Sequence, residues 1–318
     1  MKILYGTKNN NIDVTVICYK NLMKSNIVKI SRDDDYRANI FTDPCWGVVK
    51  SIFIMKENNL QLEYDHTNDI YIDTTTNDIY SKDIPEYIRV IYPDYHEKLK
   101  NIHSKLKIGY GNLQEEYPEQ MMTVRYLTGH EKVLEIGSNI GRNSLVINYI
   151  LSQKNNNNFV TLESDTEIAN VLKYNRDLNN FHFHIENAAL SKRKLIQKGW
   201  NTITSNLLLD GYKNVNTITF EELNQKYNIQ FDTLVLDCEG AFYYILMDMP
   251  EILENINLII MENDYDDISH KKYIDDILRK NNFCVDYVEC GGSELAYTKF
   301  PHLYDRFFEV WKKQSQLL

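Results

Sequence analysis

The stretch Val133-Leu134-Glu135-Ile136-Gly137-Ser138-Asn139-Ile140-Gly141 decides the fold. An apolar run that ends in two spaced glycines predicts a strand, a tight turn and a helix over 142–151, because glycine tolerates the backbone angles of the turn and lets a ligand approach. The spacing is Gly-x-x-x-Gly, so the Gly-x-Gly-x-x-Gly fingerprint for pyrophosphate is absent. We expect a nucleotide-like ligand of another kind here; an ordinary strand-to-helix turn is the alternative.

The next predicted strand, Phe159 to Glu163, also ends in a carboxylate. Nucleotide-binding folds place an acid at this point to bind the two hydroxyls of a ribose. Glu163 is therefore a second ligand contact, followed by Ser164. Two such features at suitable spacing are harder to obtain by chance than one.

A third strand, near residues 181–185, is followed by Asn187 and Ala188. Small and amide side chains at a strand end suit a flat adenine ring, which needs a close wall and a polar partner at its edge. Asn187 is the candidate for that partner, although an isolated asparagine in a loop is common.

Thr233-Leu234-Val235-Leu236 is the most apolar strand, and Asp237, Cys238, Glu239 and Gly240 follow it. In parallel sheets ligands bind at the carboxyl ends of the strands, so Asp237 and Glu239 are the candidate catalytic carboxylates. A further apolar strand, 256–261, ends in Glu262, Asn263 and Asp264. The alternation of strands and helices from 133 to 288 predicts an α/β fold with a mostly parallel sheet.

Acids also precede the Val133 strand, in the run Gln114-Glu115-Glu116-Tyr117-Pro118-Glu119 at the start of a predicted helix. They could line the mouth of an active site or be solvated at the helix start, where the helix dipole favours negative charge. Solvation is the favoured interpretation.

The first hundred residues have a different texture, with short predicted strands at 12–18, 26–30, 47–55, 60–64 and 70–72. We expect a small β-rich domain over 1–100, separate from residues 101–318. Its aromatic residues Trp46, Tyr64 and Tyr71 could stack on sugars, although core or oligomer contacts are the commoner roles of such side chains. Carbohydrate binding and oligomerisation are both predicted roles of this domain.

The composition of the 318 residues, 43% hydrophobic and 25% charged, is that of a globular protein, and the net charge is −10. An acidic balance disfavours a nucleic-acid partner. No apolar run is long enough for a membrane span, so a cytoplasmic location is expected. The five scattered cysteines, without a Cys-x-x-Cys pair, predict neither a disulfide framework nor a zinc site.

Together, the Val133–Gly141 stretch, the Asn187 strand end, Asp237-Cys238-Glu239-Gly240-Ala241 and Glu262 resemble FkbM-type S-adenosylmethionine (SAM) methyltransferases. The resemblance covers about 115–313 and implies a Rossmann-like class I methyltransferase fold with a seven-stranded sheet and O-methylation of a sugar or glycan. It implies SAM contacts at Glu135, Gly137, Ser138, Asn139, Gly141, Glu163, Ser164, Asn187, Ala188 and Asp237. The family often has an acid where Phe242 stands here, which puts any contact of that acid in doubt. The first domain is similar to modules of glycan-modifying proteins of large DNA viruses, for which the location would be the host cytoplasm.

Methylation of a hydroxyl calls for a general base, for which Asp237 is the first candidate and Glu239 the second. The acids Asp237, Glu239, Glu262 and Asp264 could instead bind Mg²⁺. We favour the reaction without a metal. The other functional class that stays open is a carbohydrate-binding or structural protein with a methyltransferase fold that does not catalyse.

Overall fold

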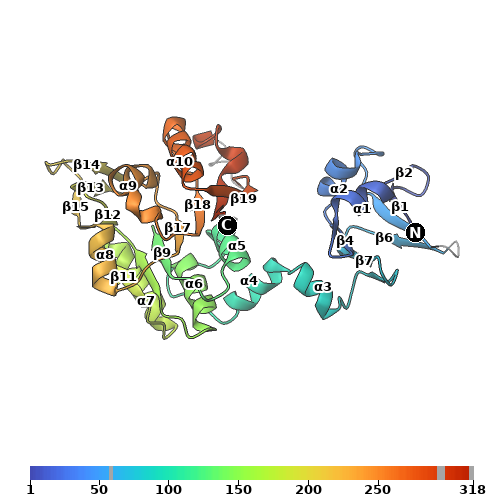
Figure 1. Cartoon of the computed structure of the whole chain (residues 1–318), viewed down its shortest axis with the longest axis horizontal. Coiled ribbons are helices and arrows are strands. Elements are labelled where there is room, and N and C mark those ends of the chain that lie inside the picture. The colour runs from blue at the N-terminus through green and yellow to red at the C-terminus, as the bar shows by residue number, and fades with distance from the viewer. Residues whose placement is uncertain (57–59, 292–297, 315–318) are drawn as a thin grey trace. The chain divides into compact units, whose positions relative to one another are not determined.

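The computed structural model describes residues 1–56, 60–291 and 298–314 (Figure 1). The chain forms two compact units, Met1–Asp94 and Tyr95–Leu318. The predicted division after residue 100 falls inside helix α4 (Tyr95–His103) and is six residues late. Leu99 and Ile102 of α4 are buried in the core of the larger unit, so the helix belongs there. None of the described helices is both long enough and apolar enough to cross a bilayer.

The smaller unit contains two antiparallel four-stranded sheets, in the orders β2-β1-β5-β6 and β3-β4-β7-β8. Side chains from both sheets, such as Tyr5 and Val28, share one hydrophobic core. The elements are β1 (Lys2–Gly6), β2 (Asn11–Asp13), α1 (Thr15–Asn21), β3 (Met23–Lys24), β4 (Ile27–Ile30), α2 (Asp34–Phe41), β5 (Ser51–Met55), β6 (Gln61–Tyr64), β7 (Ile70–Asp73), β8 (Ile79–Tyr80) and α3 (Glu86–Ile91).

One predicted strand of this unit, 12–18, is wrong from residue 14 onward, because β2 ends at Asp13. The Asp13 carboxylate accepts hydrogen bonds from the backbone and the hydroxyl of Thr15, at 3.0 and 2.6 Å, and the chain turns there into helix α1. Val14 and Cys18 are both buried. Their spacing of four fits one face of a helix as well as one face of a strand, so the apolar pattern alone was ambiguous.

The larger unit has a seven-stranded sheet in the order β11-β10-β9-β17-β18-β20-β19. The first five strands are parallel, and β20 runs antiparallel to both of its neighbours. This arrangement confirms the predicted Rossmann-like class I methyltransferase fold. In Figure 1 the central strands β9, β17 and β18 lie between α9 and α10 on one side and α5 and α6 on the other.

The strands of the main sheet are β9 (Val133–Ile136), β10 (Phe159–Leu162), β11 (His184–Glu186), β17 (Thr233–Leu236), β18 (Leu258–Glu262), β19 (Phe283–Glu289) and β20 (Phe308–Lys313). The helices are α4, α5 (Tyr117–Tyr126), α6 (Arg142–Ser152), α7 (Thr166–Leu178), α8 (Phe220–Tyr227), α9 (Phe242–Asp248) and α10 (Ile268–Lys280), with short 3-10 turns at η1 (Pro250–Leu253) and η2 (Tyr304–Arg306). Every residue of β9, β10 and β17 is buried, as expected for strands covered on both faces.

An insertion follows β11 that the sequence patterns did not reveal. It pairs β12 (Ala189–Leu190) with β16 (Thr217–Ile218), and between these strands lies a small antiparallel sheet of β13 (Leu195–Lys198), β14 (Asn201–Thr204) and β15 (Lys213–Val215). These strands are two to four residues long, too short to give a clear alternation.

Candidate functional site

The central strands of the sheet end at one level. Ile136 of β9 is in register with Leu162 of β10 and with Leu236 of β17, and Leu236 is in register with Met261 of β18. The next residue after each of these four is, in sheet order, Glu163, Gly137, Asp237 and Glu262. The register therefore places three carboxylates and the glycine turn in one row, at the edge where parallel sheets bind ligands.

The turn after β9 lies directly against the end of β17. Gly137 has a φ of +84°, and a Cβ atom there would lie 1.5 Å from the backbone oxygen of Asp237. The backbone N–H groups of Gly137 and Ser138 both donate to the carbonyl of Leu162, at 3.1 and 3.2 Å. Only glycine fits at position 137, because any side chain would push the turn away from β17. Gly141, with a φ of +93°, is the last residue before α6.

Asn139 and Glu163 join the turn to β10. The Asn139 N–H donates to one oxygen of the Glu163 carboxylate at 2.9 Å, and the Asp165 N–H donates to the other at 2.8 Å. Glu163 is 5% exposed, and burial raises its pKa. The carboxylate is thus fixed at the point where the sequence predicted a ribose contact.

The residues predicted around adenine lie next to Glu163 but bond mainly to the chain itself. The Asn187 amide donates to the Glu163 carbonyl at 2.9 Å, and its oxygen accepts from the Thr166 hydroxyl at 2.9 Å. Ser164 donates to Gln197 at 3.1 Å. Asn187 and Ala188 line a second, open cleft on the side of β16 and α8, distinct from the cleft at Asp237.

Glu135 points inward from β9 to α6 and β10. Its carboxylate accepts hydrogen bonds from the Ser144 hydroxyl and, at 2.7 Å, from the Thr161 hydroxyl. Burial raises the pKa of Glu135 to about 7. The two hydrogen bonds fix the first turn of α6 against the sheet.

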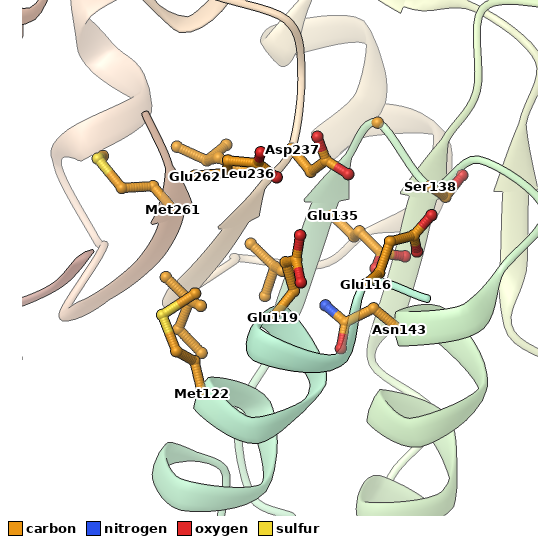
Figure 2. A pocket seen from close by; sticks show the side chains of 13 residues that line it. Glu116, Glu119, Met122, Glu135, Ser138, Asn143, Leu236, Asp237, Met261 and Glu262 are labelled. Atoms are coloured by element: carbon orange, nitrogen blue, oxygen red, sulfur yellow. The ribbon is translucent and has the colours of Figure 1, made fainter. Parts of the chain in front are cut away.

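A narrow cleft opens at the row of strand ends (Figure 2). Four of the predicted site residues line it, namely Glu135, Gly137, Ser138 and Asp237, together with Glu116, Glu119, Met122, Asn143, Val235, Leu236, Ile260, Met261 and Glu262. Helix α5 forms one wall, and Figure 2 shows the Glu119 side chain extending from it toward Asp237.

Glu116 and Glu119 were predicted to be solvated, and that prediction is wrong. Glu119 is 8% exposed. Glu116 accepts from Arg142 at 2.7 Å and from the Asn139 amide at 2.9 Å, and burial raises its pKa to about 7. Because α5 packs on α6 and beside β18, its first turn faces the cleft and not the solvent. The one sequence signal for this position was that these acids precede the glycine turn, which is compatible with a place at the mouth of an active site.

Three carboxylates meet in the cleft. Glu119, Asp237 and Glu262 each place an oxygen within 4.8 Å of an oxygen of the other two. Burial and the neighbouring acids raise the pKa of Asp237 and of Glu262 well above the ordinary value, and burial also raises the pKa of Glu119. Such a cluster can take up a proton from a substrate or surround a cation.

Glu239 does not join this cluster. The chain leaves β17 at Leu236, and Glu239, with a left-handed φ of +50°, is exposed and lies 3.9 Å from Lys299. Asp264 accepts a hydrogen bond from the Gly240 N–H at 3.0 Å. Phe242, at the position where the resemblance suggests an acid, is fully buried. Of the two predicted catalytic carboxylates, the structure places only Asp237 in the cleft.

The first unit presents one exposed aromatic side chain of the three that were considered for sugar stacking. Trp46 is 93% exposed, whereas Tyr71 is buried and Tyr64 packs against the core. The five cysteines are all free, and Cys18 alone is fully buried.

Many solved structures are similar to the chain, among them the following three. The O-methyltransferase from Bacillus cereus in complex with SAH is 13% identical, with 72% of this chain and 96% of that chain covered and a TM-score of 0.38. The ribosomal protein L11 methylase from Lactobacillus delbrueckii subsp. bulgaricus is 14% identical, with 65% and 82% covered and a TM-score of 0.38. A protein in the NADB-Rossmann superfamily from Streptococcus agalactiae is 12% identical, with 63% and 69% covered and a TM-score of 0.38.

Similarity this low carries no assignment of activity. No protein-family model and no curated protein matches the sequence. The activity is therefore inferred from the geometry of the site itself.

Proposed function

We propose that this protein is a SAM-dependent O-methyltransferase that acts on a hydroxyl of a sugar or glycan. The observation that carries the proposal is the row of strand ends, in which the Gly137 turn lies between Glu163 and Asp237. A fixed carboxylate on one side of a glycine turn suits a ribose, and a second carboxylate on the other side suits a hydroxyl that must lose a proton. The FkbM resemblance points to the same activity.

The residues around the turn fit SAM by their chemistry. Glu163 offers a buried carboxylate to two ribose hydroxyls, and the Gly137–Gly141 turn, which precedes α6, allows close approach. Asn187 and Ala188, in the next loop along the sheet edge, are the proposed contacts of the adenine ring. When bound, SAM supplies a methyl group on a positively charged sulfur.

Asp237 is the proposed general base. During methyl transfer from SAM to the acceptor oxygen, the Asp237 carboxylate would take up the hydroxyl proton. A general base contributes about 10²–10⁴-fold to such a step. The raised pKa of Asp237, caused by burial and by Glu119, makes it a stronger base than an exposed carboxylate. The cleft walls would align the reacting atoms, which are about 3 Å apart in a reactive complex.

Titration calorimetry of the full chain with SAM and with S-adenosylhomocysteine tests the cofactor. We expect saturable micromolar binding of both, followed by transfer of radiolabelled methyl from SAM to a member of a panel of sugars and glycans. Absence of heat with either ligand would contradict the proposal. Binding without transfer to any sugar, but with transfer to protein or RNA, would retain the methyltransferase and reject the sugar.

A second candidate function, carbohydrate binding by the first unit, is favoured by Trp46, whose side chain is 93% exposed in a turn. A flat aromatic face in water is a surface on which a sugar ring can stack. A glycan array probed with the full chain and with Trp46→Ala tests it. Binding that is lost in the variant supports a lectin role, and equal responses from both proteins reject it.

A further inference from the structure

The carboxylates of Glu119, Asp237 and Glu262 come from three separate elements, the first turn of α5 and the ends of β17 and β18. Their oxygens lie within 4.8 Å of one another (Figure 2). Surface acids often gather without consequence, because water screens their repulsion. Glu119, however, is 8% exposed, and Asp237 and Glu262 are partly buried, so water screens this cluster less than one on the surface.

One oxygen of this cluster has no partner. Oε2 of Glu119 is buried and, among the described residues, receives no hydrogen bond. A buried carboxylate oxygen without a donor costs about 1–3 kcal/mol or more, and buried polar atoms of this kind call for an explanation such as a bound ion. The orphaned oxygen belongs to the side chain that points into the cluster.

The neighbouring cations are already engaged elsewhere. Arg142 bonds to Glu115 and, at 2.7 Å, to Glu116. Lys299 lies 3.9 Å from Glu239. Within the described part of the chain, no lysine or arginine forms an ion pair with Glu119, Asp237 or Glu262.

We propose that Glu119, Asp237 and Glu262 bind one hard divalent cation, of the class of Mg²⁺, Mn²⁺ or Ca²⁺. Carboxylate oxygens are the ligands such ions prefer, whereas zinc sites in proteins favour nitrogen and sulfur. On the sequence alone, such a cation is the less favoured alternative. The site proposed here differs from the set of acids that the sequence suggested, because Glu119 is included and Glu239 and Asp264 are not.

The spacing of the oxygens suits this class of ion. Oxygen ligands lie about 2.1 Å from Mg²⁺ and up to about 2.6 Å from Ca²⁺, so two ligands of one ion are roughly 3 to 5 Å apart. The separations in the cluster, at most 4.8 Å, fall in that range. Three protein ligands leave coordination positions for water or for a substrate oxygen.

A catalytic role for the cation rests on the proposed function. If the protein transfers methyl groups as proposed, the cation would lie beside the acceptor hydroxyl, held by one oxygen of Asp237 while the other oxygen accepts the proton. A bound cation lowers the pKa of a coordinated hydroxyl and so assists its deprotonation. The binding of the cation does not depend on that reaction.

The direct test uses Mn²⁺ as the probe, on the full chain without SAM, because free Mn²⁺ gives an electron paramagnetic resonance signal that broadens on binding. We expect one site per chain and displacement of Mn²⁺ by excess Mg²⁺ or Ca²⁺. In Glu119→Gln and in Glu262→Gln the affinity should fall by at least tenfold, since each removes a charged ligand from a cluster of three.

Glu254→Gln is the matched control, because this exposed acid lies just before β18, at the opposite end of the strand from Glu262. It should keep the wild-type affinity. No tight Mn²⁺ site in the wild type, or equal affinity in the wild type and both cluster variants, would overturn the proposal.

Thermal unfolding gives a second readout that does not depend on turnover. Wild-type protein should melt at a higher temperature with Mn²⁺, because a ligand that binds only the folded state stabilises it. Without metal, Glu119→Gln should melt at or above the wild-type temperature, since it removes one of three repelling acids, and Mn²⁺ should add little. An equal Mn²⁺ shift in both proteins would reject the site. SAM calorimetry on the same samples separates this outcome from failure of the proposed function.

Discussion

The backbone N–H of Asn139 donates to the Glu163 carboxylate at 2.9 Å, and this bond joins the turn after β9 to the end of β10. A second donor, the Asp165 N–H, bonds to the other oxygen at 2.8 Å. The carboxylate is therefore fixed before any ligand arrives. A fixed ligand contact loses little conformational entropy on binding, which favours affinity.

Glu163→Gln should weaken SAM binding by about 10- to 100-fold, because hydrogen bonds to a charged group contribute about 1.5–3 kcal/mol. In addition, the NH₂ group of the glutamine cannot accept a hydrogen bond, so the N–H of Asn139 or of Asp165 loses its acceptor. Calorimetry with SAM measures the change.

Glu131→Gln is the control for that variant. The Glu131 carboxylate also accepts two backbone N–H bonds, from Thr128 at 2.8 Å and Gly129 at 2.9 Å, but it precedes β9 and so lies at the opposite edge of the sheet. Its SAM affinity should stay within about threefold of wild type. Equal losses in the two variants would remove Glu163 from the binding site.

Gly137→Ala should abolish SAM binding, because the new Cβ would lie 1.5 Å from the Asp237 carbonyl oxygen and force the turn away from β17. Gly199→Ala separates this clash from backbone strain. Gly199 also has a positive φ, +58°, but a Cβ atom there would meet no other atom within 4 Å among the described residues. We expect it to bind SAM normally, and a similar loss in both variants would contradict the steric argument.

Asp237→Asn should lower the rate of methyl transfer by about 10²–10⁴-fold and change SAM affinity only a few-fold, because the amide cannot accept the proton. Glu239→Gln should have a much smaller effect, since Glu239 is exposed outside the cleft. Single-turnover rates with radiolabelled SAM compare the two. Near-normal turnover of Asp237→Asn would exclude Asp237 as the base.

The larger unit should lose stability as the pH rises from about 4.5 to 7, because burial raises the folded-state pKa of Glu135 to about 7. A folded state that holds its proton more tightly than the unfolded state is favoured at low pH. Glu135→Gln lacks this titrating group. Between pH 4.5 and 7, the free energy of unfolding of the variant should therefore rise by up to roughly 3 kcal/mol relative to that of the wild type. Urea unfolding at several pH values measures the difference, and parallel pH profiles would refute it.

Much of the arrangement at the carboxyl ends of the central strands was predictable from sequence, because local sequence signals mark each of these ends. Gly137, Glu163 and Asp237 each follow a short apolar run, and parallel strands bring such positions together. The start of α8 carries a similar local signal, because Thr219 and Glu222 form a capping box with both of its hydrogen bonds.

The rest depended on packing between distant segments. Whether Glu119 faces water or the cleft is decided by how α5 lies on α6 and β18, which no local pattern encodes. Glu239 looked equivalent to Asp237 by the alternation of a strand, but the strand ends at Leu236 and the backbone turns. The alternation around Val14 failed because a spacing of four is shared by strands and helices.

The position of β20 in the sheet bears on the order in which the protein can fold during synthesis. β20 lies between β18 and β19, and among the described strands β19 pairs with β20 alone. Strand β19 leaves the ribosome before β20. It can join the sheet only after residues 308–313 have emerged and paired with β18, because β20 is the strand with which it pairs. Until then Glu262, which is in register with Phe308, lies on an unpaired edge. The backbone of Glu262, one of the three acids of the cluster, is therefore paired late, by the last strand of the sheet to be made.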